Sequence, residues 1–179
     1  FCVCGGDWLR NSDTKEEALD KLNGIDSMLY DVFKFSYFPV LGNHDTNYQG
    51  ITVDGSSDSA ILPYYQICES LFNRFEQTYY SFTTRKTLYL VLDTGIEWSY
   101  TIDEYRIKQI DWFYKMLMNN RKEHIVVFLH IYKAGGEVIH PFPSILMDIS
   151  LAFNEKRIMT ANDYIMDFTN AKGKVSCFI

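Results

Sequence analysis

The sequence has no long hydrophobic run and no long basic run, and each absence argues against a class of protein. No apolar stretch reaches the roughly 20 residues that a membrane-spanning helix needs, so no membrane span is expected. Lys and Arg never cluster beyond a pair and the net charge is −6, which argues against a broad nucleic-acid-binding face. A nucleotide substrate is still compatible with this charge.

Signatures of several enzyme classes are also missing. The absence of a GxSxG nucleophile elbow and of a GxxxxGK[ST] loop disfavours an α/β-hydrolase and a P-loop NTPase. No CxxC is present, so a zinc site built from thiolates lacks support. The four cysteines are expected to be buried free thiols, which favours a reducing, cytoplasmic compartment. They are Cys2, Cys4, Cys68 and Cys177.

The composition is that of a globular protein. Hydrophobic residues make up 47% of the 179 residues and charged residues 22%, which is enough apolar material for one core and argues against disorder. We therefore predict a single domain over residues 1–179. The 13 Tyr, 13 Phe and 3 Trp residues are expected mainly in the core and in the walls of a cleft.

The first 41 residues predict a strand, a helix and a second strand. Residues 1–4 are an apolar run that stops at two glycines, which is typical of a buried strand followed by a tight turn. Residues 12–32 repeat apolar side chains at steps of three and four, which predicts an amphipathic helix. Residues 37–41 form a second apolar run. This order predicts a parallel βαβ unit.

The rest of the chain alternates predicted strands and helices. Strands are expected at 78–84, 88–94, 125–129 and 175–179, and helices at 61–75, 103–120, 144–154 and 162–170. The segments 49–59 and 134–144 are rich in Gly, Ser, Asp or Pro and are predicted to be loops.

Polar residues follow three of the predicted strands directly. Asp7 follows the first strand, Asn43, His44 and Asp45 follow the second, and His130 follows the strand at 125–129. Taken singly, Asp7 and Asn43 also suit turns, and His130 also suits a hydrogen-bonded core histidine. Because ligands gather at the carboxyl ends of strands in α/β sheets, the set favours a shared site. Carboxylate, amide and imidazole ligands suit Mn, Fe or Zn.

These ordered motifs resemble those of the calcineurin-like metallophosphoesterases. The chain carries GGDWLRN, GNHD and FLH, and this family carries GDxxD, GNH[DE] and a lone His in the same order. GNHD after a buried strand is the most specific match. The resemblance covers most of the chain and implies the family's α/β fold, a mixed β-sandwich flanked by helices in four α/β/β/α layers.

The resemblance also implies a role for each residue of the set. Asp7 matches a carboxylate that bridges two divalent metal ions, and Asn43 and His130 match ligands of the second ion. His44 matches a histidine that meets the phosphate and protonates the leaving oxygen, and Asp45 would hold the other nitrogen of that imidazole. The implied cofactors are two divalent ions, with Mn, Fe and Zn all open.

The chain departs from the family pattern at several places. The first motif, DxH, and the last motif, GHxH, are absent, and we expect a fragment that is truncated at both ends. Arg10 stands where GDxxD has its second acidic residue, so it is either a phosphate contact or a surface ion-pair residue. No tyrosine stands there, which disfavours the purple acid phosphatases. His140, in a predicted cleft loop, is a second substrate-binding candidate.

The predicted activity is hydrolysis of a phosphate mono- or diester by metal-bound hydroxide at a two-metal site. The alternative is a non-catalytic binding or scaffolding protein of the same fold with an incomplete metal site. The loops at 49–59 and 133–144 would select the substrate, which the sequence does not identify, and the oligomeric state also stays open.

Overall fold

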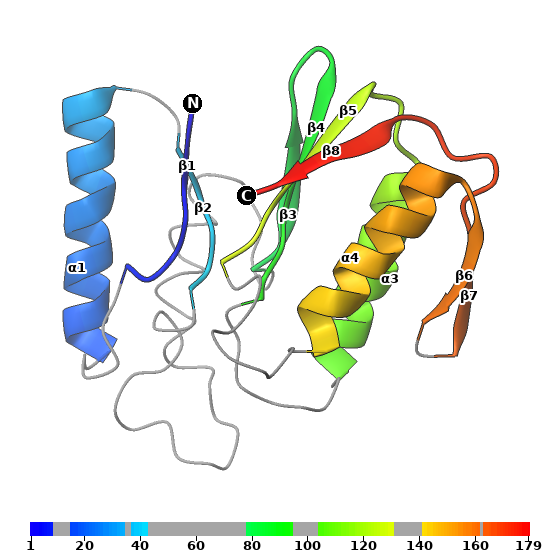
Figure 1. Cartoon of the computed structure of the whole chain (residues 1–179). Coiled ribbons are helices and arrows are strands. Elements are labelled where there is room, and N and C mark those ends of the chain that lie inside the picture. Colours follow the sequence, from blue (N-terminus) through cyan, green and yellow to red (C-terminus); the bar gives the residue numbers. More distant parts are fainter. Residues whose placement is uncertain (9–14, 35–36, 43–77, 95–103, 131–140, 162) are drawn as a thin grey trace. The chain divides into compact units, whose positions relative to one another are not determined.

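The computed structural model describes residues 1–8, 15–34, 37–42, 78–94, 104–130, 141–161 and 163–179 (Figure 1). These residues form a mixed α/β protein, as the sequence predicts. They divide into two compact units. The first unit consists of Phe1–Tyr80, Leu92–Glu97 and Leu129–Ile131, and the second of Ser81–Val91, Trp98–Phe128 and Tyr132–Ile179.

The first unit begins with a parallel βαβ arrangement. Strand β1 (Cys2–Cys4) pairs with strand β2 (Tyr37–Pro39), and helix α1 (Lys15–Met28) lies between them in the sequence. The pairing confirms the prediction made from two short apolar runs separated by an amphipathic segment. β2 is largely buried, but β1 is only half-buried, so the expectation of a buried first strand is met only in part.

Helix α1 continues into a π-helical turn, η1 (Leu29–Phe33), and ends at Lys34. Lys34 adopts a left-handed conformation with φ of 55°, and its N–H donates to the carbonyl oxygen of Tyr30 at 3.1 Å. This bond satisfies one of the carbonyls that a helix end leaves without an intrahelical partner. Met28 and Val32, which belong to the predicted apolar face, are 50% and 66% exposed, so that face is covered only in part.

A four-stranded sheet forms the centre of the second unit. Its order is β3 (Tyr80–Thr83), β4 (Thr87–Val91), β5 (His124–Phe128) and β8 (Lys174–Phe178), and the last three run parallel. β3 and β4 form a hairpin (Figure 1). All four strands were predicted. The predicted strand at 88–94 is buried except at Tyr89, which is half-buried, as a run of apolar side chains predicts.

Two helices pack together beside this sheet within the second unit. Helix α3 (Glu104–Met118) confirms the predicted helix at 103–120, and it contacts helix α4 (Pro141–Glu155) (Figure 1). Fully buried aromatic and aliphatic side chains from both helices build the core, and burial of each is worth about 1.5–3 kcal/mol. They are Phe113, Leu117, Leu146, Ile149 and Phe153.

Two local predictions are wrong in this unit. Residues 162–170 were predicted to be helical, but strands β6 (Ile158–Ala161) and β7 (Tyr164–Asp167) form an antiparallel pair there. Asp163, at the connection, has a left-handed φ of 64°, which suits a tight turn rather than a helix. Residues 141–144 were assigned to a loop, but α4 begins at Pro141, because proline is well accepted in the first turn of a helix.

The described strands form one sheet of four strands and two of two strands, consistent with the α/β class. The four-layer calcineurin-like sandwich and the single-domain organisation stay predictions. The predicted loop at 49–59 and helix at 61–75 lie outside the described residues. Within the residues that the structure describes, no helix combines the length and hydropathy needed to cross a membrane.

Candidate functional site

The structure describes two of the predicted site residues, Asp7 and His130. The remaining candidates, which are Arg10, Asn43, His44, Asp45 and His140, lie outside the described residues. Asp7 follows β1, and His130 follows β5 after one intervening residue, Leu129. Both belong to the first unit.

Asp7 and His130 contact each other directly. His130 Nε2 lies 3.2 Å from Asp7 Oδ2, and the two side chains are 18% and 35% exposed respectively. The prediction that residues at the ends of separate strands converge is therefore confirmed for this pair. Partial burial strengthens their electrostatic interaction relative to a fully solvated pair.

The second ring nitrogen of His130 is held by the backbone. His130 Nδ1 lies 2.6 Å from the carbonyl oxygen of Gly5. Since a carbonyl oxygen only accepts hydrogen bonds, Nδ1 carries the hydrogen and donates it. Nε2 then faces Asp7 in one of two forms: as the second N–H of an imidazolium, or with a lone pair that shares a cation with the carboxylate.

Glycines let the backbone of Asp7 come close to its neighbours. Gly6 has a φ of 88° and Asp7 a φ of 58°, so the chain turns through two left-handed residues directly after β1. A Cβ on Gly6 would lie 2.7 Å from His130 Nδ1. A Cβ on Gly42 would collide with the backbone N and with Oδ1 of Asp7. Gly42 immediately precedes the predicted ligand Asn43 in the GNHD motif.

The Asp7–His130 pair fits a shared metal ion. Ligand atoms in adjacent positions around one ion lie roughly 3.0–3.4 Å apart when each bond is about 2.1 Å. The observed separation of 3.2 Å falls in that range. Among the described residues, no three His, Cys, Asp or Glu side chains form a metal-binding group, so this pair alone would not make a complete site.

A buried polar pair in the same unit was not predicted from the sequence. The Thr78 hydroxyl donates to Asp93 Oδ2, and the two residues are 0% and 3% exposed. Nearby, the Tyr80 hydroxyl donates to the carbonyl oxygen of Pro39 at 2.5 Å. The available signal was that Asp93, like Asp7 and His130, lies at the carboxyl end of an apolar run.

Trp8 and two cysteines pack around β2. The Trp8 indole N–H donates to the Val40 carbonyl at 3.3 Å and its ring lies 6.0 Å from that of Tyr37, as expected for a packing residue. Cys2 and Cys4 are free thiols whose sulfurs lie 3.9 Å apart on one face of β1. Burial, together with the neighbouring Cys2 thiol, raises the pKa of Cys4 to about 12.

The predicted burial of the cysteines holds only in part. Cys2 and Cys4 are half-buried, while Cys177 is exposed, so the expectation is wrong for Cys177. The pairing of β5 and β8 shifts at Ser176, so Val175 lies opposite the buried Ile125 and Cys177 lies opposite the half-buried Val126, next to the exposed Ser176. Cys68 lies outside the described residues.

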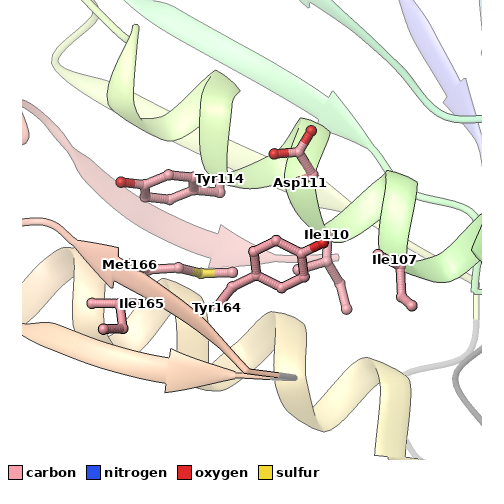
Figure 2. Close-up of a pocket in the computed structure, with 7 residues that line it drawn as sticks. All are labelled: Ile107, Ile110, Asp111, Tyr114, Tyr164, Ile165 and Met166. Atoms are coloured by element: carbon pink, nitrogen blue, oxygen red, sulfur yellow. The ribbon is translucent and has the colours of Figure 1, made fainter.

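The second unit contains a small pocket. It lies between α3 and the β7 strand and has a volume of about 70 Å³ (Figure 2). In this pocket Asp111 Oδ2 forms an ion pair with Lys115 Nζ at 2.5 Å. Neither Asp7 nor His130, the two predicted site residues that the structure describes, lines it. The lining residues are Ile107, Ile110, Asp111, Tyr114, Tyr164, Ile165 and Met166.

Comparison with known proteins does not identify a family. No family model matches this chain, and a search of curated proteins returns no match.

Proposed function

We propose that this protein is a metal-dependent phosphoesterase that hydrolyses a phosphate mono- or diester at a two-metal site. The observation that supports the proposal most directly is the contact between Asp7 and His130, 3.2 Å between carboxylate and imidazole. Both were expected as metal ligands from the order of the motifs. The Gly5 carbonyl supports it further, because holding Nδ1 directs the Nε2 atom of His130 to the carboxylate.

A second function fits the same contact. An imidazolium that donates to a carboxylate is a satisfactory ion pair without any metal, and a protein of this kind would be a non-catalytic binding or scaffolding protein. The two proposals differ in one measurable property, which is whether Asp7 and His130 bind a divalent ion.

In the phosphoesterase, Asp7, Asn43 and His130 would hold the ions. When bound, two such ions supply Lewis acidity and an activated water for in-line attack at phosphorus. Oxygen and imidazole ligands suit Mn, Fe or Zn, so these residues fit divalent ions of that kind. The left-handed turn at Gly6 and Asp7 would hold the carboxylate in place.

The neighbouring residues would handle the substrate. His44 would protonate the leaving oxygen, and Asp45 would hold the other imidazole nitrogen and so fix the tautomer. Arg10 and His140 would contact the phosphate or the rest of the substrate. These four roles follow from the resemblance and are part of the proposal.

Manganese binding tests the ligand assignment. Protein expressed from its complete reading frame is titrated with Mn²⁺, and free ion is followed by electron paramagnetic resonance. Asp7→Asn and His130→Ala are each expected to lower Mn²⁺ affinity about tenfold or more, because the first removes a negative charge and one of the two carboxylate oxygens, and the second removes the imidazole. His124→Ala is the matched control, since His124 hydrogen-bonds Ser176 instead. Unchanged affinity in both ligand variants would support the scaffolding protein.

Hydrolysis of p-nitrophenyl phosphate and of bis(p-nitrophenyl) phosphate then tests the reaction. His44→Ala is expected to keep Mn²⁺ bound while kcat falls by about 10²–10⁴, which is the usual contribution of general acid catalysis. A protein that binds Mn²⁺ through Asp7 and His130 but hydrolyses neither ester would contradict the catalytic proposal and leave the metal site standing.

A further inference from the structure

Basic residues precede three neighbouring strands of the four-stranded sheet. Each of β4, β5 and β8 begins at or directly after a turn that carries two cations. All but Lys122 are exposed, and Lys122 is half-exposed. We call this set the basic edge. It consists of Arg85, Lys86, Arg121, Lys122, Lys172 and Lys174.

The register of the sheet aligns these turns. Thr87 of β4 lies opposite His124 of β5, and His124 lies opposite Lys174 of β8, so the three parallel strands begin level with one another. Neighbouring strands are about 4.8 Å apart, which places the three turns within roughly 10 Å along the edge of the sheet. The β3–β4 turn and the starts of β5 and β8 lie at the same end of the sheet (Figure 1).

Hydrogen bonds tie the three turns together. Lys122 Nζ donates to the Arg85 carbonyl at 3.3 Å. Asn120, which is buried, donates from Nδ2 to the carbonyls of Lys122 and Lys172 at 2.9 and 3.0 Å. The cations are therefore carried on turns of fixed geometry rather than on a flexible tail.

The basic edge is cationic although the whole chain is acidic. It holds six of the 17 Lys and Arg residues, while Glu123 is the only acidic residue within 84–86, 119–123 and 170–174. Glu123 pairs with Lys86 at 3.4 Å, and both side chains are more than 60% exposed, so this pair neutralises little. Over the residues that the structure describes, the side chains of Arg85, Lys172 and Lys174 make no ion pair.

The basic edge lacks the groups that other anionic partners require. The large hydrophobic side chains that are exposed in the described part of the chain all lie elsewhere. Phe82 and Tyr89, on the two strands of the β3–β4 hairpin, are half-buried and stack on each other. Among the described residues the edge therefore presents no fully exposed ring to stack on the bases of a single strand, and no exposed apolar side chain to anchor it in a lipid surface. A double helix presents phosphates outward with its bases inside, and cations alone suffice to bind it.

We propose that the basic edge binds the phosphate backbone of double-stranded nucleic acid without sequence preference. The expectation of no broad nucleic-acid-binding face rested on the net charge of −6 and on cations that are consecutive in the sequence. The parallel pairing of β4, β5 and β8 brings together three pairs of cations that are far apart in the sequence. The proposal concerns the second unit and does not depend on the phosphoesterase activity.

Fluorescence anisotropy with a labelled 20-base-pair duplex of arbitrary sequence, between 50 and 200 mM KCl, tests the proposal. Arg85→Gln, Lys122→Gln and Lys174→Gln are combined in one variant, which takes one cation from each turn. The matched control combines Lys34→Gln, Lys108→Gln and Lys115→Gln, which are exposed and outside the edge. Both triple variants lower the net charge by the same amount.

The unmodified protein is expected to bind with a dissociation constant of about 10⁻⁴–10⁻⁶ M, and affinity should fall as salt rises. The edge variant should lose at least about tenfold in affinity at 50 mM KCl. Its slope of log affinity against log salt should be shallower by roughly 2.7, or about 0.9 for each lost phosphate contact. The control variant should keep both values. Each single edge variant, checked by thermal melting, should lower the slope by about 0.9.

Three results would overturn the proposal. The first is no binding of the duplex at 50 mM KCl by the unmodified protein. The second is an equal loss of affinity in the two triple variants, which would show an effect of net charge alone. The third is tighter edge-dependent binding to vesicles with 30% phosphatidylserine, or to a single strand, than to the duplex, which would assign the edge to that partner.

Discussion

Gly42, which follows β2, can lie against Asp7 because it has no side chain. A Cβ at this position would collide with backbone and side-chain atoms of Asp7. Gly42→Ala is therefore expected to lower the free energy of unfolding by about 1–3 kcal/mol, as other overpacking substitutions do. Urea denaturation followed by circular dichroism measures this change.

Gly24→Ala is the matched control for this prediction. A Cβ on Gly24, within α1, meets no atom within 4 Å, and alanine is the better helix former by about 0.5–1 kcal/mol. The same substitution should thus stabilise the protein at Gly24 and destabilise it at Gly42. Equal midpoints for the two variants would contradict the close approach of Gly42 to Asp7.

The thiols of this protein are expected to differ in reactivity. Burial and the neighbouring Cys2 thiol raise the pKa of Cys4 to about 12, so Cys4 is almost fully protonated at pH 8. Because the thiolate is the nucleophile, iodoacetamide should alkylate Cys4 at least about tenfold more slowly than the exposed Cys177. Peptide mass spectrometry over a time course measures both rates, and similar rates would contradict the prediction.

The raised pKa of Cys4 also sets a direction for stability against pH. A raised pKa means that the folded state favours the protonated thiol more than the unfolded state does. The resulting stabilisation is present below the unfolded value of 9.0 and is lost as pH rises toward 12. In Cys4→Ala this loss should be absent from the alkaline limb of the stability curve.

Sequence reasoning found Asp7 and His130 because a simple rule connects them. Residues at the carboxyl ends of strands tend to converge. His130 stands directly after an apolar run, and Asp7 follows one after the two glycines Gly5 and Gly6. Asp93 also follows such a run, but its hydroxyl partner Thr78 precedes another strand. No rule of composition or spacing pairs those two, so only the folded chain shows the contact.

At the scale of elements, Asn120 connects the turns that precede β5 and β8. Its amide donates to the carbonyls of Lys122 and Lys172, and its Oδ1 accepts from the Lys122 N–H at 2.9 Å. Asn120→Ala would leave these groups without their partner and should cost about 1–3 kcal/mol. Urea denaturation measures the loss, with the exposed Asn119→Ala as control. A loss in Asn120→Ala no larger than in the control would mean that water replaces the amide.

Element prediction succeeded where the pattern was long or continuous. The helix at 104–118 has a clear helical period, and the strands at 87–91 and 124–128 are nearly continuous apolar runs. All three were predicted to within a few residues. The β6–β7 pair was missed because its short apolar groups fit a helix as well as a strand. The deciding feature is the left-handed Asp163, a backbone property that the sequence does not display.

At the scale of the whole molecule, the charge of −6 conceals an uneven distribution. The basic edge gathers six cations in a chain with 23 acidic residues, so the rest of the surface is more acidic than the average suggests. Net charge describes solubility and long-range repulsion, but contact with a partner depends on the local field. The total charge can be counted from the sequence, but the position of the charges on the molecule follows only from the strand register.

The chain also assembles the first unit from distant parts of its length. That unit combines Phe1–Tyr80, Leu92–Glu97 and Leu129–Ile131, and the bond between Gly5 and His130 spans 125 positions. Contacts of such separation form late in folding, because closing a long loop costs conformational entropy before the contact stabilises the fold. During synthesis from the amino terminus, Asp7 is therefore made long before His130. The pair cannot form on the ribosome until the segment after β5 has emerged.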